Sequence, residues 1–134
     1  SVVGIKQVPR EEVGAYGVLD PSGPLDDDNG VVPARDLVEK PDPADAPSDM
    51  ILIGRYVLTP DIFDEIARTE PGRGGEIQLT DALRVQAARG PFHGVLSMVD
   101  RFDTGTPIGY LHAAVALGMR DPEVAAVLRP LLTD

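Results

Sequence analysis

The feature that most constrains the fold is a nearly continuous apolar run, from Met50 to Leu58, that leads directly into Thr59-Pro60-Asp61. The run has the length of a strand, and because so few of its side chains are polar we expect both of its faces to be buried. Threonine followed by proline and aspartate is typical of a helix start, with Thr59 as the N-cap. A buried strand that runs straight into a helix predicts an α/β chain.

Strands are expected before this run, and helices mostly after it. Stretches rich in apolar and β-branched residues predict further strands over residues 1–8, 16–20, 37–40 and 92–99. Capping residues followed by apolar periodicity predict helices that start at Thr59, near Glu76, at Thr106 and at Asp121. Residues 25–33 are expected to form an acidic, exposed excursion, and residues 71–75 to break the chain. The order fits one end of an α/β sheet with a helical tail over about 106–134.

Composition narrows the classes of function. With 134 residues the chain is at most one domain, or a piece of one. A net charge of -10 argues against nonspecific nucleic-acid binding, which needs a basic face, although a locally basic pocket can still hold an anion. The sequence contains no cysteine, which excludes disulfides and thiolate chemistry and is compatible with a reducing cytoplasm. It shows no signal-peptide pattern and no apolar run of membrane-spanning length.

Glu39-Lys40-Pro41, at the end of a predicted strand, carries the most informative chemistry. Glu39 can accept hydrogen bonds from sugar hydroxyls and Lys40 can neutralise a phosphate, so the pair suits a sugar phosphate. Ligands of α/β sheets bind beyond the carboxyl ends of strands. Side chains alternate on an extended strand, so the strand end must curl if both residues engage one ligand. A solvated surface pair is the alternative that the two residues alone leave open.

Other positions also have both a structural and a functional interpretation. Gly54 interrupts the apolar run, either as a bulge or tight packing site, or so that the backbone can approach a ligand. Asp103 opens a segment that either caps a helix through Thr106 or places phosphate oxygens or Mg²⁺ near the helix start. Thr80 and Glu76 are expected to cap a helix rather than to contact substrate.

The two histidines, His93 and His112, have no second ligand at metal-binding spacing, and we expect surface or packing roles for both. The sequence has no Ser-His-Asp arrangement and no lipase-type elbow. The absence of a nucleophile is expected if the chemistry is direct phosphoryl-type transfer.

Several longer motifs follow one another along nearly the whole chain. They are Ala15-Tyr16-Gly17-Val18, Val38-Glu39-Lys40-Pro41, Ile53-Gly54-Arg55-Tyr56-Val57-Leu58, Gly75-Glu76-Ile77-Gln78-Leu79-Thr80-Asp81-Ala82, Asp103-Thr104-Gly105 and Gly109-Tyr110. In this order they resemble the C-terminal half of the bacterial UTP–glucose-1-phosphate uridylyltransferase family, also called UDP-glucose pyrophosphorylases. The Glu-Lys-Pro element is shared across sugar-nucleotide pyrophosphorylases, whereas the Ile-Gly-Arg-Tyr and Glu-Ile-Gln-Leu-Thr-Asp elements point more narrowly to the UDP-glucose enzymes.

The resemblance implies a Rossmann-like, mixed-sheet α/β nucleotidyltransferase fold, of which residues 1–134 would be the C-terminal, sugar-phosphate-binding part. It implies transfer of a uridylyl group from UTP to glucose-1-phosphate, giving UDP-glucose and pyrophosphate, with Mg²⁺ as cofactor. Carried over, Glu39 would bind glucose hydroxyls and Lys40, as the catalytic residue, the sugar-linked phosphate. Gly17 would offer backbone to the sugar, and Asp103 would lie near the metal. Gly54 is added as a predicted substrate-binding residue on the ligand interpretation of a glycine in a strand.

The family's glycine-rich loop and its uracil-binding and first metal-binding segments belong to an N-terminal nucleotide-binding half that this sequence lacks. We therefore expect the isolated 134 residues to be inactive. The expected setting is a cytoplasmic homo-oligomer with small-molecule substrates and without nucleic-acid or membrane partners. Base specificity stays open between uridylyl- and thymidylyl-, adenylyl- or guanylyltransferases. A non-catalytic module, in which the helices from Thr106 onward mediate oligomerisation, is an alternative of a different class.

Overall fold

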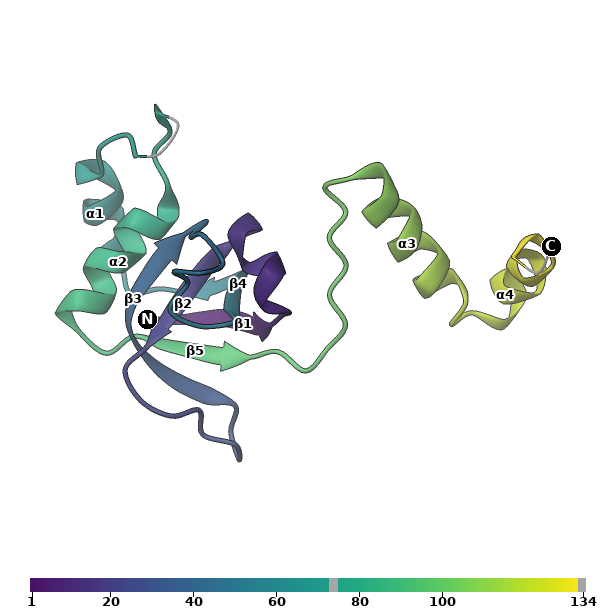
Figure 1. Cartoon of the computed structure of the whole chain (residues 1–134), viewed down its shortest axis with the longest axis horizontal. Helices are drawn as coiled ribbons and strands as arrows, with labels where there is room; N and C mark the ends of the chain where they lie inside the picture. Colours follow the sequence, from purple (N-terminus) through teal and green to yellow (C-terminus); the bar gives the residue numbers. More distant parts are fainter. Residues whose placement is uncertain (73–74, 133–134) are drawn as a thin grey trace. The chain divides into compact units, whose positions relative to one another are not determined.

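The structure, a computed structural model that describes residues 1–72 and 75–132, falls into two units, Ser1–Met98 and Val99–Asp134 (Figure 1). Arg73 and Gly74, inside the predicted chain break, lie outside the described residues. The strands of the first unit are β1 Val2–Gln7, β2 Gly17–Pro21, β3 Val31–Glu39, β4 Met50–Val57 and β5 His93–Leu96. Its helices are the 3₁₀ helix η1 Arg10–Ala15 and the α-helices α1 Ile62–Arg68 and α2 Leu79–Arg89.

The strands described in the first unit close into a barrel in the order β1-β4-β2-β3-β5. Neighbouring strands are antiparallel except β1 and β5, which run parallel with Val2 opposite His93 and Ile5 opposite Leu96. The predicted α/β class with a mixed sheet is confirmed. Closure was not predicted, because alternation reports which face of a strand is buried and not which strand lies beside it.

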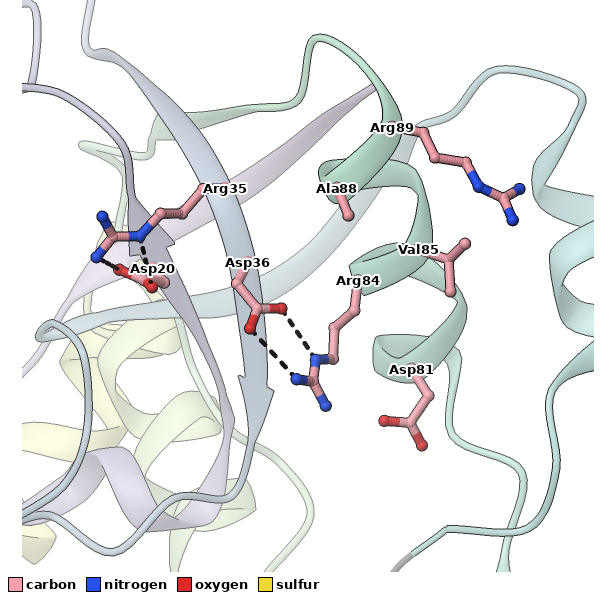
Figure 2. A pocket seen from close by; sticks show the side chains of 8 residues that line it. All are labelled: Asp20, Arg35, Asp36, Asp81, Arg84, Val85, Ala88 and Arg89. Atoms are coloured by element: carbon pink, nitrogen blue, oxygen red, sulfur yellow. Dashed lines mark hydrogen bonds and ion pairs between the residues drawn. The ribbon is translucent and has the colours of Figure 1, made fainter.

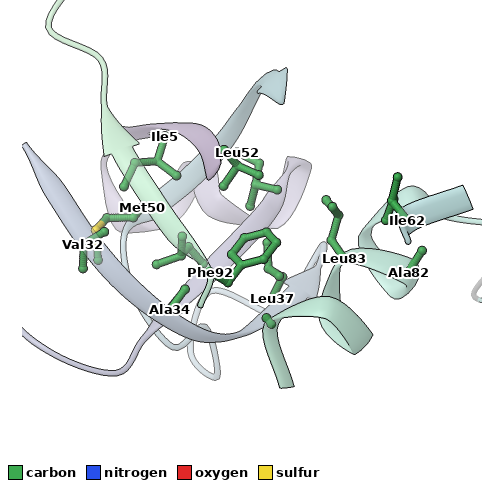
Figure 3. Close-up of a cluster of buried hydrophobic side chains, with 13 residues drawn as sticks. Ile5, Val32, Ala34, Leu37, Met50, Leu52, Ile62, Ala82, Leu83 and Phe92 are labelled. Atoms are coloured by element: carbon green, nitrogen blue, oxygen red, sulfur yellow. The ribbon is translucent and has the colours of Figure 1, made fainter. Parts of the chain in front are cut away.

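The helix α2 packs against β3 on one side of the barrel, α1 packs against α2, and both helices contribute side chains to the core (Figures 1 and 3). Leu83 of α2 and Ile62 of α1 are buried in one cluster with strand side chains, and Phe92, directly before β5, is 2% exposed. Gly94 lets β5 pass this core closely, since a Cβ there would lie 2.8 Å from Ile5 Cδ1 and 2.9 Å from Leu19 Cδ1. Close packing of this kind holds α2 in a fixed position on the barrel.

β4 departs from the expected burial on both faces. Residues 50–52 are buried, but residues 55–57 are exposed. Gly54 and Arg55 have φ angles of 76° and 57°, and the register with β1 shifts between Val3 and Ile5. This is a β-bulge, which bends a strand and interrupts its alternation, so the second half of β4 leaves the core.

Three element boundaries also differ from the prediction. α1 begins at Ile62 rather than Thr59, whose Oγ1 instead accepts a hydrogen bond from Gln86 Nε2 at 3.1 Å. β3 begins at Val31, inside the predicted excursion, because pairing with β2 and β5 overrides its polar and proline content. β5 ends at Leu96, earlier than expected.

The second unit contains α3 Pro107–Gly118, α4 Pro122–Leu128 and the 3₁₀ helix η3 Arg129–Leu131. Both predicted helix starts are confirmed. Thr106 Oγ1 accepts from the amide of Gly109 at 3.1 Å, and Asp121 Oδ1 accepts from the amide of Glu123 at 2.9 Å. In the described part of the chain, no helix has both the length and the apolar character needed to cross a membrane.

Candidate functional site

Glu39 ends β3, and Lys40 follows it at one end of the barrel. β2 runs antiparallel beside β3, so its first residue, Gly17, lies directly opposite Glu39. The amide of Lys40 donates to the carbonyl of Tyr16 at 3.0 Å, which extends the pairing one step beyond the strand. The fold therefore brings together three of the residues that the sequence singled out, from two separate motifs.

Lys40 has a left-handed backbone conformation, with φ of 45°, which is uncommon for a residue that carries a side chain. The turn interrupts the alternation of the strand, and Glu39 and Lys40 consequently line the same pocket, with Lys40 Nζ 3.5 Å from Glu39 Oε1. The strand end thus curls in the way that binding of one ligand by both residues requires. Such conformations cost about 1–3 kcal/mol and are concentrated at functional sites.

The pocket, here called the Glu39–Lys40 pocket, has a volume of about 560 Å³. It is lined by Gly14, Glu39, Lys40, Pro41, Asp42, Pro43, Glu76 and Gln78. Arg10 fixes one wall, because its Nε donates to the carbonyl of Pro43 at 2.7 Å and its Nη2 donates to the carbonyl of Ala46. The volume is within the range of small-molecule sites, roughly 300–1,000 Å³.

The carboxylate of Glu39 has partners on both oxygens. Thr80 Oγ1, in the first turn of α2, donates to Glu39 Oε2 at 2.7 Å, and Lys40 lies beside Oε1. Thr80 is 9% exposed and the Glu39 side chain 19%. The expected capping role of Thr80 is therefore corrected, because its hydroxyl bonds to a strand residue 41 positions earlier in the chain.

Gly17 lies against this hydrogen bond. A Cβ on Gly17 would lie 3.1 Å from Glu39 Oε2 and 3.4 Å from Thr80 Oγ1. These distances are tighter than ordinary contacts, so the missing side chain leaves room for the bonded pair. The structure thus gives a geometric reason for glycine at position 17: a larger residue would crowd the hydrogen bond between Thr80 and Glu39.

Tyr56, on β4, also belongs to the surroundings of Glu39. Burial raises the pKa of the Tyr56 phenol, and the negative charge of Glu39 raises it further. The phenol therefore keeps its proton at neutral pH. Sequence analysis did not select Tyr56, because the bulge that redirects β4 is not visible in the apolar pattern.

Gly54 is accounted for by its backbone. Its φ of 76° favours glycine, whereas a Cβ there would meet no atom of the described residues within 4 Å. The bulge interpretation therefore fits the structure. A contribution of Gly54 to substrate binding stays a prediction, and Gly54 stands apart from the residues that line the Glu39–Lys40 pocket.

Asp103 belongs to the second unit, whereas Gly17, Glu39, Lys40 and Gly54 belong to the first. Its Oδ1 accepts from the amide of Gly105 at 3.0 Å, and its Oδ2 lies 3.4 Å from Arg101 Nη2. Within residues 1–72 and 75–132, no three His, Cys, Asp or Glu side chains gather as a metal site would require. A metal at Asp103 would thus depend on further ligands from a substrate.

The two histidines have ordinary structural surroundings. His93 opens β5, is half-buried, and pairs through its backbone with Val2 and Pro33. His112, on α3, is exposed, and its ring meets Phe102 edge to face with centroids 5.6 Å apart. Both observations agree with the surface or packing roles expected for them.

A second pocket, here called the arginine groove, lies between α2 and the neighbouring strands β2 and β3 (Figure 2). Its volume is about 650 Å³. It is lined by Asp20, Arg35, Asp36, Asp81, Arg84, Val85, Ala88 and Arg89. None of these residues was a predicted site residue, because they are spread over three elements without a motif that all of them share.

The arginines of this groove form ion pairs that join different elements. Arg35 binds Asp20 through two hydrogen bonds of 2.9 and 3.1 Å, and Arg84 binds Asp36 through two of 2.9 and 3.3 Å. Burial would raise the pKa of Asp36, but the hydrogen bonds from Arg84 and from a backbone amide outweigh it and lower that pKa. Arg89 binds the buried carboxylate of Glu65 on α1. These pairs fasten α2 to β3 and α1.

Comparison with known proteins identifies the class. Residues 2–119 match the nucleotidyl transferase family model, so the chain belongs to that family. It is 48% identical over 108 residues to the UTP–glucose-1-phosphate uridylyltransferase of Komagataeibacter xylinus, covering 81% of this chain and 37% of that protein. Against the enzyme of the same name from Pseudomonas aeruginosa strain PAO1, identity is 49% over 113 residues, covering 84% and 39%. The resemblance drawn from the motifs is confirmed.

Solved structures agree with this result. The crystal structure of a UDP-glucose pyrophosphorylase complexed with UDP-glucose superposes with a TM-score of 0.83 at 43% identity, covering 90% of this chain and 44% of that one. A UTP-bound UGPase from Acinetobacter baumannii gives 0.82 at 28% identity, covering 99% and 45%. The chain spans about two fifths of the length of the curated relatives named above.

Proposed function

We propose that this chain is the sugar-phosphate-binding part of an enzyme that converts UTP and glucose-1-phosphate into UDP-glucose and pyrophosphate, reversibly. The observation that supports this most directly is the left-handed backbone conformation of Lys40, through which the Glu39 carboxylate and the Lys40 ammonium line one pocket. A carboxylate suits sugar hydroxyls and an ammonium suits phosphate, so the pair matches glucose-1-phosphate. Relatives that are 48% and 49% identical to this chain bear the name of this activity.

In the proposed reaction a phosphate oxygen of glucose-1-phosphate attacks the α-phosphorus of UTP in line. The bond from that phosphorus to the bridging oxygen breaks, and pyrophosphate leaves. Lys40 binds the attacking phosphate and offsets its repulsion from the triphosphate. Glu39 accepts from glucose hydroxyls and orients the sugar. Gly17 and Gly54 are proposed to contribute backbone to the same ligand. Positioning and charge neutralisation supply most of the catalysis.

Asp103 is the residue proposed to hold Mg²⁺. Mg²⁺ is commonly bound by one or two carboxylates together with substrate phosphates, and the Asp103 side chain is 49% exposed, so one carboxylate oxygen can meet such a metal. When bound, the ion would neutralise negative charge on the phosphates.

The proposal also covers the setting of the enzyme. The complete domain would be Rossmann-like, cytoplasmic and homo-oligomeric. The lack of cysteine agrees with a reducing compartment, and exposed apolar side chains such as Leu111 and Leu117 on α3 agree with further packing partners. A thymidylyltransferase neighbour at 20% identity shares the fold, and that similarity does not extend to its substrate.

The test is an assay of nucleotide-sugar and pyrophosphate formation by the whole protein that carries this chain, with each common nucleoside triphosphate in turn. We expect UDP-glucose from UTP and glucose-1-phosphate, and no product from the isolated 134 residues. Preference for dTTP, ATP or GTP would move the assignment to another sugar nucleotidyltransferase. Failure to form product with any of them would favour the non-catalytic module.

A further inference from the structure

The Glu39–Thr80 contact joins a candidate ligand-binding side chain to a helix that is fixed by the core. Thr80 occupies the second position of α2, and α2 is anchored to the barrel by buried side chains that include Ala82 and Leu83 (Figure 3). Threonine is β-branched, so its χ1 angle is restricted and only a few directions are open to its hydroxyl on this helix. The donor to Glu39 is therefore held by the barrel core and not by a loop.

Glu39 without this bond would have several rotamers available. Its side chain has three χ angles, and Lys40, the partner on its other oxygen, is 51% exposed and 3.5 Å away. An exposed, long ion pair restrains a side chain weakly. Of the two contacts of the Glu39 carboxylate, the 2.7 Å hydrogen bond from Thr80 is the shorter, so it determines the position of the carboxylate.

From these contacts we infer that Thr80 is a positioning residue, which holds the Glu39 carboxylate in the orientation that accepts the sugar hydroxyl. This rests on the proposed function, in which Glu39 binds the sugar. Thr80 then affects sugar recognition without touching the sugar. A carboxylate held in advance discriminates between sugars, because an analogue without the hydroxyl leaves it unpaired.

The test measures the dissociation constant of glucose-1-phosphate and of its 2-, 3-, 4- and 6-deoxy derivatives by calorimetry, with the whole protein that carries this chain. The variants are Thr80→Val, which keeps the shape and removes the donor, Thr80→Ser, which keeps the donor, and Glu39→Gln. Thr69→Val is the matched control, since its hydroxyl bonds to the carbonyl of Glu65 on α1. The KM for UTP and the unfolding temperature are recorded for each.

We expect Thr80→Val to weaken glucose-1-phosphate binding about tenfold, as for loss of a hydrogen bond to a charged group. Thr80→Ser should retain most of the affinity, and Thr69→Val all of it. The decisive readout is selectivity: the deoxy analogue that Glu39→Gln fails to weaken should also be the one that Thr80→Val fails to weaken. A change in KM for UTP is not expected.

Two results overturn the inference while leaving the proposed function intact. One is a Thr80→Val variant with unchanged affinity beside a weakened Glu39→Gln variant. The other is an equal loss for glucose-1-phosphate and all of its deoxy analogues, which would show that Thr80 has only a general structural role. Unchanged affinity in Glu39→Gln itself would instead refute the sugar site of the proposed function, and the inference with it.

Discussion

The Glu39–Lys40 pocket and the arginine groove are of similar size, about 560 and 650 Å³, yet they differ in how their charges are held. In the groove, Arg35 and Arg84 each meet a carboxylate through two hydrogen bonds, and neither arginine has a positive φ angle. In the pocket, Lys40 has a left-handed backbone and lies 3.5 Å from Glu39, which a neutral hydroxyl holds. The size of a pocket therefore does not tell whether its charged side chains stabilise the fold or bind a ligand. Backbone strain and the geometry of the ion pairs distinguish the two pockets.

Among the variants that test this difference, Lys40→Ala is expected to have the largest effect on activity. Removing the ammonium should lower kcat/KM for glucose-1-phosphate about a hundredfold, because the attacking phosphate loses its positive partner. Unfolding should be little changed, since the Lys40 side chain is 51% exposed. Steady-state kinetics and thermal unfolding measure both. Arg84→Ala serves as the matched cation deletion in the groove, and equal kinetic losses in the two variants would erase the distinction.

Gly17→Ala should have the next largest effect on ligand binding. Its Cβ would lie 3.1 Å from Glu39 Oε2, so the carboxylate must move, and affinity for glucose-1-phosphate should fall about tenfold. Titration calorimetry measures it. Gly94→Ala is the control in the core, where the new Cβ meets three packed side chains and should cost about 1–3 kcal/mol of stability without selective loss of binding. Unaltered affinity in Gly17→Ala would contradict the crowding argument.

Arg84→Ala should destabilise the protein by about 1 kcal/mol or less, because the Arg84 and Asp36 side chains are 48% and 35% exposed and solvent screens their attraction. Denaturant unfolding measures the loss, and binding of glucose-1-phosphate should be unaffected. A marked loss of that binding would mean that the groove belongs to the functional site and would break the comparison.

The smallest effect concerns pH. The folded pKa of Asp36 is lowered, so its pairing stabilises the fold above the unfolded pKa, about 4, and this contribution is lost as pH falls through the folded pKa. The stability difference between the wild type and Arg84→Ala should therefore be constant above about pH 5 and shrink toward zero in more acidic buffer. Unfolding temperatures across the acidic range test this. The lowered pKa of Asp26 affects both proteins equally and cancels. A stability difference between the two proteins that grows as the pH falls would contradict the lowered pKa of Asp36.

Local structure was largely predictable from particular residues. The caps Thr106 and Asp121 set helix starts through their own side chains, so the sequence located α3 and α4. Thr59 misled the prediction, because its hydroxyl bonds to Gln86 of another helix. β3 was predicted too short, since its stability comes from neighbours on both edges and not from its own composition.

The candidate site was predictable only in part. Glu39, Lys40 and Gly17 were found because their motifs are contiguous, and the family resemblance gave them roles. Thr80 was expected only to cap a helix and Tyr56 was given no role, because a hydrogen bond across 41 positions and a bulge-directed tyrosine depend on tertiary packing. Asp103 lies in the other unit, and its proposed metal role rests on resemblance together with donor chemistry.

The parallel pairing of β1 with β5 has a consequence for the speed of folding. These strands are neighbours in space but come from the two ends of the sequence of the first unit. The barrel therefore cannot close until nearly all of that sequence is available. Contacts of such long sequence separation slow the search for the native state. During synthesis the earlier strands must wait for Phe92 to Leu96 to leave the ribosome. We therefore expect docking of the last strand to limit the rate of folding, and substitutions such as Gly94→Ala to slow refolding as well as lower stability.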